Sequence, residues 1–312
     1  MKLFKEIVKK MSVDGIDVEE ARQLANLKRL DPMRIFYNVK NFNVVHEDYK
    51  IPVRLYFPKR RNQKIAPNVF IYIHGGGWTT DSIDTYDRIC EKLARNMNHY
   101  VFSIDYRLAP EHKFPTGLMD CYWVVRTIYK YMDSSRVTLI GDSAGGNLVA
   151  ALSLLAKEKQ EFNIQRQILI YPALNSDYSQ NSPYASVHEN GKDYILTSGK
   201  LQDYIDLYSS CQEDKQNPYL APILAKDVTN MPDTLLITAQ FDPLKDEGKA
   251  FAHRLEEAGN FVQQYEIQNA MHGFFALAIS NFHVDECFTY IRKFLDEREV
   301  HVCLTNENIG EN

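Results

Sequence analysis

The chain has few cysteines, and their spacing suits neither a disulfide framework nor a metal site. Its 312 residues include five cysteines, which are widely separated and form no C-x-x-C pair. An odd, scattered set argues against a small secreted fold held by disulfides and against a zinc site. We therefore expect no metal and no cofactor, with each thiol buried or incidental.

Long apolar runs and targeting signals are also lacking. The first eleven residues, MKLFKEIVKKM, alternate lysine with apolar residues and lack the apolar core and cleavage site of a signal peptide. No stretch approaches the roughly 18 uninterrupted apolar residues of a membrane-spanning helix. We therefore expect a cytoplasmic protein without stable membrane insertion.

An excess of positive charge is missing as well. The formal net charge is −5 at pH 7, with 36 Lys and Arg residues against 41 Asp and Glu. This balance offers no broad electropositive surface for nucleic acid. Neither the Gly-Lys-Ser/Thr ending of a phosphate loop nor the G-x-G-x-x-G dinucleotide pattern occurs. A small-molecule ligand is the better expectation.

What the chain does contain is ample apolar material, in short runs that alternate with helical patterns. Residues are 45% hydrophobic and 12% aromatic, which is enough for a sizeable core. After an alternating hairpin within 43–57, strands are expected at 69–73, 100–104, 137–140, 168–171, 235–238 and 262–267. Helices are expected at about 84–96, 118–131, 145–157, 245–258 and 284–297. This alternation is typical of an α/β fold with a mostly parallel, doubly wound sheet.

Two segments fall outside the alternation. Near the start, Phe4 to Met11 has helical spacing, and Asp17 with Glu20 resembles an N-cap before a second helix that runs through Leu30. The long interval between strands 168–171 and 235–238 contains one helix candidate, at about 200–209. Because a structureless loop of that length is improbable in a compact domain, we expect an inserted cap over the carboxyl edge of the sheet.

The sequence GDSAG at 141–145 follows an expected strand and opens an expected helix. That is the context of a nucleophile elbow, in which a serine occupies a sharp turn between strand and helix. Only small neighbours let strand and helix approach this closely. The pattern indicates that Ser143 is the nucleophile of an acyl-transfer enzyme.

A serine hydroxyl is a weak nucleophile, so it needs a base, and the base needs an orienting acid. In this arrangement the partners follow the serine in the order acid, histidine. Asp242 follows strand 235–238 and His272 follows strand 262–267, which makes them the candidate acid and base. Asp246 and Glu247 are rival acids, but they fall on the first turn of an expected helix, where acids commonly interact with the helix dipole.

Acyl transfer also requires hydrogen-bond donors for the oxyanion. The sequence HGGGW at 74–78 ends strand 69–73, and its glycines let backbone N–H groups turn into a site without a Cβ in the way. The expected donors are the N–H groups of Gly76, Gly77 and Ala144. His74 is expected to hold this loop rather than to transfer protons.

Together these segments resemble the hormone-sensitive-lipase-like branch of the α/β-hydrolases, the bacterial carboxylesterase group called family IV. The likeness extends from about residue 69 to the last helix and includes DYRLAPE at 105–111 and YP at 171–172. The resemblance implies an α/β-hydrolase fold with a mostly parallel eight-stranded sheet, flanking helices and a helical cap. It also implies that Ser143, Asp242 and His272 form a catalytic triad beside a His-Gly-Gly-Gly oxyanion loop.

The same resemblance bears on domains and assembly. In that family the cap is built from N-terminal helices and an insertion before the triad acid. We therefore interpret residues 1–312 as a single α/β-hydrolase domain, with a cap formed by about 1–40 and an insertion at about 175–230. Many members pair through the last strand and helix, here about 262–298, so a homodimer is one expected state.

Several neighbours of the motifs have open roles. Trp78 and Asp142 are candidate substrate-binding residues, but Trp78 could instead seal the core, and Asp142 could instead tune the site electrostatically or cap the helix. Tyr106, Arg107 and Glu111 are interpreted as a buried polar brace under the site, since an Arg and a Glu near an apolar strand need partners.

The sequence therefore predicts a metal-free serine carboxylesterase whose partner is a small-molecule ester, cleaved through an acyl-enzyme intermediate. The resemblance favours short acyl chains, from acetyl to about hexanoyl. One alternative is a sugar or arylamide deacetylase with the same triad. Another is a non-catalytic small-molecule receptor on this fold, which is disfavoured because such proteins typically lose a triad member and all three are present here.

Overall fold

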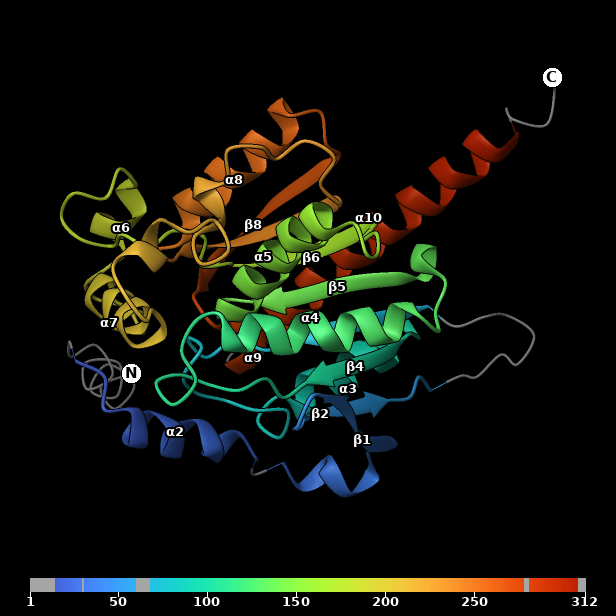
Figure 1. Cartoon of the computed structure of the whole chain (residues 1–312), viewed down its shortest axis with the longest axis horizontal. Coiled ribbons are helices and arrows are strands. Elements are labelled where there is room, and N and C mark those ends of the chain that lie inside the picture. The colour runs from blue at the N-terminus through green and yellow to red at the C-terminus, as the bar shows by residue number, and fades with distance from the viewer. Residues whose placement is uncertain (1–14, 30, 60–67, 278–280, 308–312) are drawn as a thin grey trace.

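The computed structural model describes residues 15–29, 31–59, 68–277 and 281–307, and Figure 1 gives an overview. The helix expected from Phe4 to Met11 lies outside these residues. So does Leu30, the expected end of the second helix.

Eight strands form one mostly parallel sheet, as predicted. The strand order is β1-β2-β4-β3-β5-β6-β7-β8. The strands are β1 Val39–His46, β2 Tyr49–Tyr56, β3 Val69–Ile73, β4 Tyr100–Ile104, β5 Val137–Asp142, β6 Arg166–Ile170, β7 Asp233–Phe241 and β8 Val262–Met271. The hairpin β1–β2 and the pair β2–β4 are antiparallel, and all other neighbours are parallel. Each strand expected from the sequence is present, which confirms the α/β-hydrolase fold class.

Helices cover both faces of the sheet. The longer helices are α3 Asp87–Met97, α4 Thr116–Tyr129, α5 Ala144–Lys159, α8 Lys245–Glu257 and α10 Asn281–Glu307. Buried side chains of α4, α5 and α8 belong to one core cluster, whereas those of α3 and α10 belong to a second. Within β3, Ile71 belongs to the first cluster and its neighbour Tyr72 to the second. Both are fully buried, which explains why β3 has a continuous apolar sequence.

Among the described residues before β1, few side chains are buried. Helix α2, Val18–Asn26, is capped by Asp17, whose side chain accepts the N–H of Glu20 as the sequence predicted. Ala25 is its one buried residue. The helix ends at Asn26, earlier than expected, and the 3₁₀ turns η1 Leu27–Arg29 and η2 Pro32–Phe36 follow. We call α2, η1 and η2 the N-terminal segment.

The long interval between β6 and β7 contains short helices. It comprises α6 Ala185–Glu189, α7 Ser198–Tyr208 and the 3₁₀ turns η4 Glu213–Gln216 and η5 Pro222–Leu224. Figure 1 shows α6, α7 and α2 on the side toward which the β5 arrow points. A further short helix, α9 Phe274–Leu277, follows β8. Among the helices described, none has the length and apolar character needed to cross a bilayer.

Candidate active site

Ser143 occupies a strained turn between β5 and α5. Its backbone has φ 54° and ψ −121°, a region that costs a non-glycine residue free energy and that is common at functional sites. Its N–H donates to the carbonyl of Ile170 at 2.9 Å. Gly145 lets α5 approach the neighbouring strand, because a Cβ there would lie 2.1 Å from the carbonyl oxygen of Ile73. The surrounding packing therefore holds the turn and leaves the serine partly exposed.

The structure brings the three predicted triad residues together. His272, at the end of β8, has its Nε2 3.0 Å from Oγ of Ser143 and its Nδ1 2.7 Å from Oδ2 of Asp242. Asp242 is fully buried, and its Oδ1 accepts the N–H of Leu244 at 2.9 Å. A carboxylate that accepts the Nδ1 proton leaves Nε2 free to accept the serine proton. This geometry can generate a serine nucleophile.

The rival acids do not reach the histidine. Asp246 Oδ2 accepts the N–H of Ser186 at 2.8 Å, and Glu247 Oε1 accepts the N–H of Leu174 at 2.6 Å. Both carboxylates therefore tie helix α8 to the interval between β6 and β7. Asp242 is the carboxylate that contacts His272.

The oxyanion loop offers free backbone donors. Gly76 and Gly77 both have positive φ, 100° and 57°, which glycine adopts without a steric penalty. The N–H of Gly75 is occupied, because it donates to the Tyr86 hydroxyl at 3.1 Å. By contrast, the N–H groups of Gly76, Gly77 and Ala144 donate to no acceptor among the described residues. Such unpaired donors are what an oxyanion site requires.

His74 lies beneath this loop and does not contact the triad. It is fully buried, and its Nδ1 lies 2.8 Å from the carbonyl oxygen of Gly75. Its ring stacks on Tyr106, whose hydroxyl donates to the His74 carbonyl at 2.9 Å. These contacts fit the holding role that the sequence suggested for His74.

Trp78 requires a correction. Only 2% of its surface is exposed, and its ring stacks on Tyr208 of α7 with a centroid distance of 4.8 Å and an interplanar angle of 3°. The ring therefore packs inside the core beside α7. Of the two roles that the sequence left open, the geometry favours sealing the core over lining a substrate subsite.

Asp142 also requires a correction. It is 2% exposed, and its carboxylate accepts hydrogen bonds from the hydroxyls of Tyr72, Tyr86 and Tyr171 at 2.8, 2.9 and 3.4 Å. Burial raises the pKa of this carboxyl, and the hydrogen bonds from Tyr72 and Tyr86 oppose the shift. The N-cap of α5 is Ser143, not Asp142, and Ser143 makes no side-chain capping hydrogen bond to the helix. Asp142 is therefore a buried acceptor behind the elbow and not a substrate contact.

This tyrosine cluster joins parts of the site that are distant in sequence, and sequence analysis missed it. The hydroxyl of Tyr86 accepts the N–H of Gly75 in the oxyanion loop. The hydroxyl of Tyr171 accepts the N–H of Phe275, just after the catalytic-base candidate, at 3.2 Å. Its ring also lies 4.7 Å from that of His272. The only trace of this cluster in the sequence patterns was YP at 171–172, and that pattern does not indicate that Tyr171 shares the Asp142 carboxylate with Tyr72 and Tyr86.

The predicted brace of Tyr106, Arg107 and Glu111 is only partly present. Arg107 binds Asp120, with Nη2 2.7 Å from Oδ1. The side chain of Glu111 is 54% exposed and pairs with Arg22 of α2 at 2.7 Å. The expectation of a buried Arg–Glu brace is therefore wrong, because each charge has a partner from another part of the chain.

Glu247 is a second feature that the sequence did not reveal. Its side chain is fully buried, and Oε1 accepts the N–H groups of Leu174 and Asn175 and the hydroxyl of Tyr178. Oε2 is buried without a partner among the described residues. Desolvation raises the pKa of this carboxyl to about 8, which favours the protonated acid near neutral pH.

The raised pKa predicts a pH-dependent stability that Glu247→Gln removes. Because the folded-state pKa, about 8, exceeds the ordinary value of 4.5, this group's stabilising contribution is complete below about pH 4.5 and is lost as pH rises through 8. Each pH unit in that interval is worth up to about 1.4 kcal/mol. The free energy of unfolding of the wild type, measured in urea from pH 5 to 8.5, is expected to fall relative to that of Glu247→Gln.

The exposed Glu256, on the same helix, provides a matched control. Glu256→Gln is expected to keep the wild-type pH slope. Parallel slopes for the wild type and Glu247→Gln would contradict a protonated buried carboxyl.

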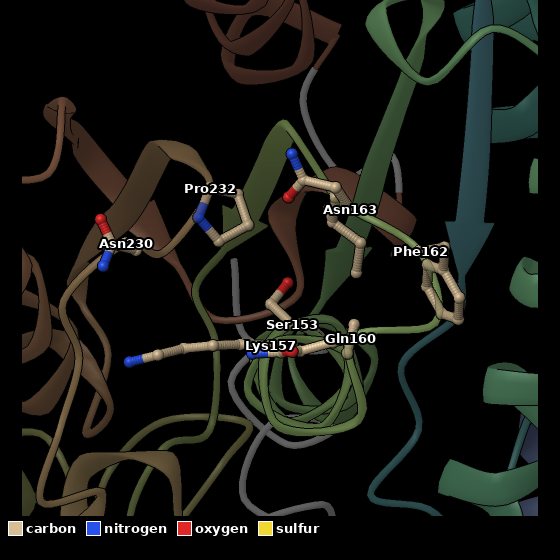
Figure 2. A pocket seen from close by; sticks show the side chains of 9 residues that line it. Ser153, Lys157, Gln160, Phe162, Asn163, Asn230 and Pro232 are labelled. Atoms are coloured by element: carbon tan, nitrogen blue, oxygen red, sulfur yellow. The ribbon is translucent and has the colours of Figure 1, made fainter.

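A cavity lies away from the triad. It has a volume of about 360 Å³, and Figure 2 shows Ser153, Phe162, Asn163 and Pro232 around it. Because Asn163 precedes β6 and Pro232 precedes β7, the cavity lies at the amino edge of the sheet, opposite Ser143. Among the described residues, no three His, Cys, Asp or Glu side chains are grouped as metal ligands would be.

Comparisons with known proteins agree on one family. Residues 70–276 match the model of a family with the α/β-hydrolase fold. The chain is 33% identical to an arylesterase of Saccharolobus solfataricus over 264 residues, covering 82% of this chain and 84% of the relative. It is 33% identical over 234 residues to an ethyl acetate hydrolase of Pseudomonas putida, covering 73% and 72% of the two chains. The structure is similar to that of a hyperthermophilic esterase from Pyrobaculum calidifontis, with a TM-score of 0.83, 30% identity and coverage of 96% and 98%.

Proposed function

We propose that this chain cleaves esters with a triad of Ser143, His272 and Asp242. The chain belongs to the α/β-hydrolase family, in its hormone-sensitive-lipase-like carboxylesterase branch, and is a carboxylic ester hydrolase. The observation that carries this proposal is the continuous hydrogen-bonded chain from the Ser143 hydroxyl through the imidazole to the buried carboxylate. The order of the three residues in the sequence also matches the order expected for this fold.

The first half-reaction forms an acyl-enzyme. Oγ of Ser143 attacks the ester carbonyl carbon while Nε2 of His272 accepts the hydroxyl proton. The carbonyl oxygen becomes an oxyanion, and the N–H groups of Gly76, Gly77 and Ala144 donate to it. When the intermediate collapses, the C–O bond to the alcohol breaks, and His272 delivers its proton to the departing oxygen.

The second half-reaction releases the acid. Water attacks the acyl carbon, His272 accepts a proton from it, and the bond to Ser143 breaks as the proton returns to Oγ. Asp242 accepts the Nδ1 hydrogen bond of His272 and stabilises the imidazolium that forms twice in each cycle. Its complete burial and its hydrogen bond from the Leu244 N–H keep it in one orientation.

We further propose that the acyl group is short. The ring of Tyr204, from α7, lies against Gly77: a Cβ on that glycine would be 2.4 Å from the ring. Helix α7 therefore packs against the glycine that carries one oxyanion donor, and Tyr208 of the same helix stacks on the neighbouring Trp78. A long acyl chain on this side would have to displace α7. The name of the relative from Pseudomonas putida, an ethyl acetate hydrolase, is consistent with a short acyl group.

A panel of esters tests the proposal. We expect kcat/KM for p-nitrophenyl esters to be highest between acetyl and about hexanoyl and to fall steeply by decanoyl, because longer chains meet Tyr204 and α7. Acetylated sugars and an arylacetamide belong in the same panel, since the same triad could deacetylate them. A preference for decanoyl or longer esters would refute the short-chain proposal, and turnover of the arylacetamide or sugar esters alone would assign a deacetylase.

A further inference from the structure

Arg22, on helix α2, binds Thr79, which directly follows the oxyanion loop 74–78, and also binds Ala109 and Glu111. Its Nε donates to the carbonyl oxygen of Thr79 at 2.9 Å, and one Nη2 bond reaches the carbonyl oxygen of Ala109 at 3.0 Å. Nη1 and Nη2 form a two-pronged pair with Glu111, each at 2.7 Å. Arginine is suited to such fixed, forked contacts. Arg22 therefore joins α2 to two segments that are distant in the sequence, Thr79 and residues 109–111.

The contact with Thr79 reaches an oxyanion donor through two peptide planes. A peptide unit is planar and trans, so fixing its carbonyl oxygen also fixes the direction of the N–H that follows. The Thr79 carbonyl, held by Arg22, shares its peptide unit with the N–H of Thr80, which donates to the Gly76 carbonyl at 2.9 Å. The Gly76 carbonyl shares its peptide unit with the N–H of Gly77, one of the three unpaired donors. Arg22 is thus two rigid units away from the oxyanion site.

Lys28, in η1, supports residues 76–81 from a second position. Its ammonium lies 2.7 Å from Oδ1 of Asp81. The Thr80 hydroxyl is within hydrogen-bond distance of both Oδ2 of Asp81, at 3.2 Å, and the Gly76 carbonyl, at 3.0 Å. Two cations of the N-terminal segment therefore bind the residues that fix the Gly76 carbonyl.

Polar contacts attach the N-terminal segment, and those of Arg22 and Lys28 are joined by the ion pairs of Arg29 and Arg34 with Asp84. Ala25 is the one buried residue of α2, whereas Leu24 and Leu27 are 48% and 60% exposed. Little apolar surface of α2 is therefore removed from water, so hydrophobic burial contributes little to docking. Arg22 and Lys28 therefore contribute both to docking of the N-terminal segment and to support of the oxyanion loop.

We propose that Arg22 is a positioning residue that couples docking of the N-terminal segment to the alignment of the Gly77 N–H in the oxyanion site. This inference rests on the proposed triad mechanism and adds to it a source of loop order outside the α/β core. When Arg22 is bound, the Gly77 N–H points where the oxyanion forms. When the contact is lost, the loop samples orientations that stabilise the transition state less.

The test compares Arg22→Gln with a matched control from the same segment. Arg29 pairs with Asp84 and does not contact residues 79–81. Arg29→Gln therefore removes a similar cation and leaves the contacts of the oxyanion loop intact. Because losing one oxyanion donor entirely costs about 100–1000-fold in kcat, misalignment of one donor in Arg22→Gln is expected to lower kcat by about 10-fold or more. KM is expected to change less than threefold, and Arg29→Gln is expected to retain wild-type kcat.

A transition-state analogue separates positioning from mere stability. Oγ of Ser143 adds to the carbonyl carbon of a trifluoromethyl ketone while His272 accepts the serine proton. The ketone oxygen becomes an oxyanion that occupies the oxyanion site. In Arg22→Gln its affinity should fall by the same factor as kcat/KM, with assays run at least 15 °C below the lowest melting temperature. A lower melting temperature with unchanged kcat and unchanged inhibitor affinity would overturn the proposal.

Three further variants complete the test. Arg22→Lys retains the charge but lacks the fork, so it should recover only part of the lost kcat, whereas full recovery would show that charge alone matters and would overturn the forked contact. Glu111→Gln preserves the Thr79 contact and should lower kcat less than Arg22→Gln. Ser143→Ala separates the triad proposal from the positioning proposal. An active Ser143→Ala refutes the triad. An inactive Ser143→Ala together with wild-type activity in Arg22→Gln refutes only the positioning role of Arg22.

Discussion

Ser143→Ala is expected to lower kcat for p-nitrophenyl acetate by about a million-fold, the scale on which loss of a serine nucleophile acts in other triad enzymes. Without Oγ, no acyl-enzyme can form. Labelling by a fluorophosphonate, which requires the same oxygen, should disappear. Both readouts follow from the 3.0 Å contact between Oγ and Nε2 of His272.

The fold should survive this change. The backbone N–H of Ser143 keeps its bond to Ile170, and only a partly exposed hydroxyl is removed. Circular dichroism and the melting temperature should match those of the wild type within a few degrees. Ser179→Ala, at an exposed serine between β6 and β7, is the control and should retain full activity and labelling. Retained labelling in Ser143→Ala would contradict the assignment.

Asp242→Asn is expected to reduce kcat by about 10⁴-fold, by analogy with the same change in other triads. The amide has nearly the same shape as the carboxylate, so the fold should be preserved. The carboxylate, however, accepts both the Nδ1 proton of His272 and the N–H of Leu244. An asparagine has one acceptor oxygen, so its NH₂ group must face one of these donors. Turned toward His272, it selects the tautomer in which Nε2 carries the proton and cannot act as base.

Asp246→Asn is the matched comparison for this prediction. Asp246 lies four residues away and accepts the N–H of Ser186, without contacting His272. Its replacement should lower kcat less than tenfold. If Asp246→Asn lost as much activity as Asp242→Asn, the role of orienting acid would have to be reassigned.

The parts of the fold and site that could be predicted are those encoded locally. The strand that leads into GDSAG is fully buried because helices cover both faces of the sheet. The helix that follows begins at Ala144. Asp242 and His272 each follow directly on a strand of the same parallel sheet. The carboxyl ends of parallel strands share one edge, so their proximity to Ser143 follows from the topology.

The parts that could not be predicted depend on contacts between distant segments. Arg22 and Glu111 are far apart in the sequence, and neither lies in a pattern that names the other. Asp142 receives hydroxyls from β3, from the residue preceding α3 and from the end of β6. Glu247 looks like an ordinary first-turn acid of α8, yet tertiary packing buries it. In each case the partner is set by the arrangement of elements, not by local spacing.

Trp78 shows the same limit at the level of one side chain. The motif HGGGW indicates where the residue lies in the chain but not to which side its ring turns. With φ 59° at Trp78, the ring turns toward Tyr208 of α7, a residue from the long interval between β6 and β7. Only the placement of α7 decides between a core and a pocket role.

The most direct test of the central claim is mass spectrometry of the wild-type protein after reaction with a fluorophosphonate. The account predicts one adduct for each chain, located by peptide mapping on Ser143, with loss of esterase activity in proportion to the labelled fraction. An adduct at another residue, or full hydrolysis by a protein labelled at Ser143, would contradict it.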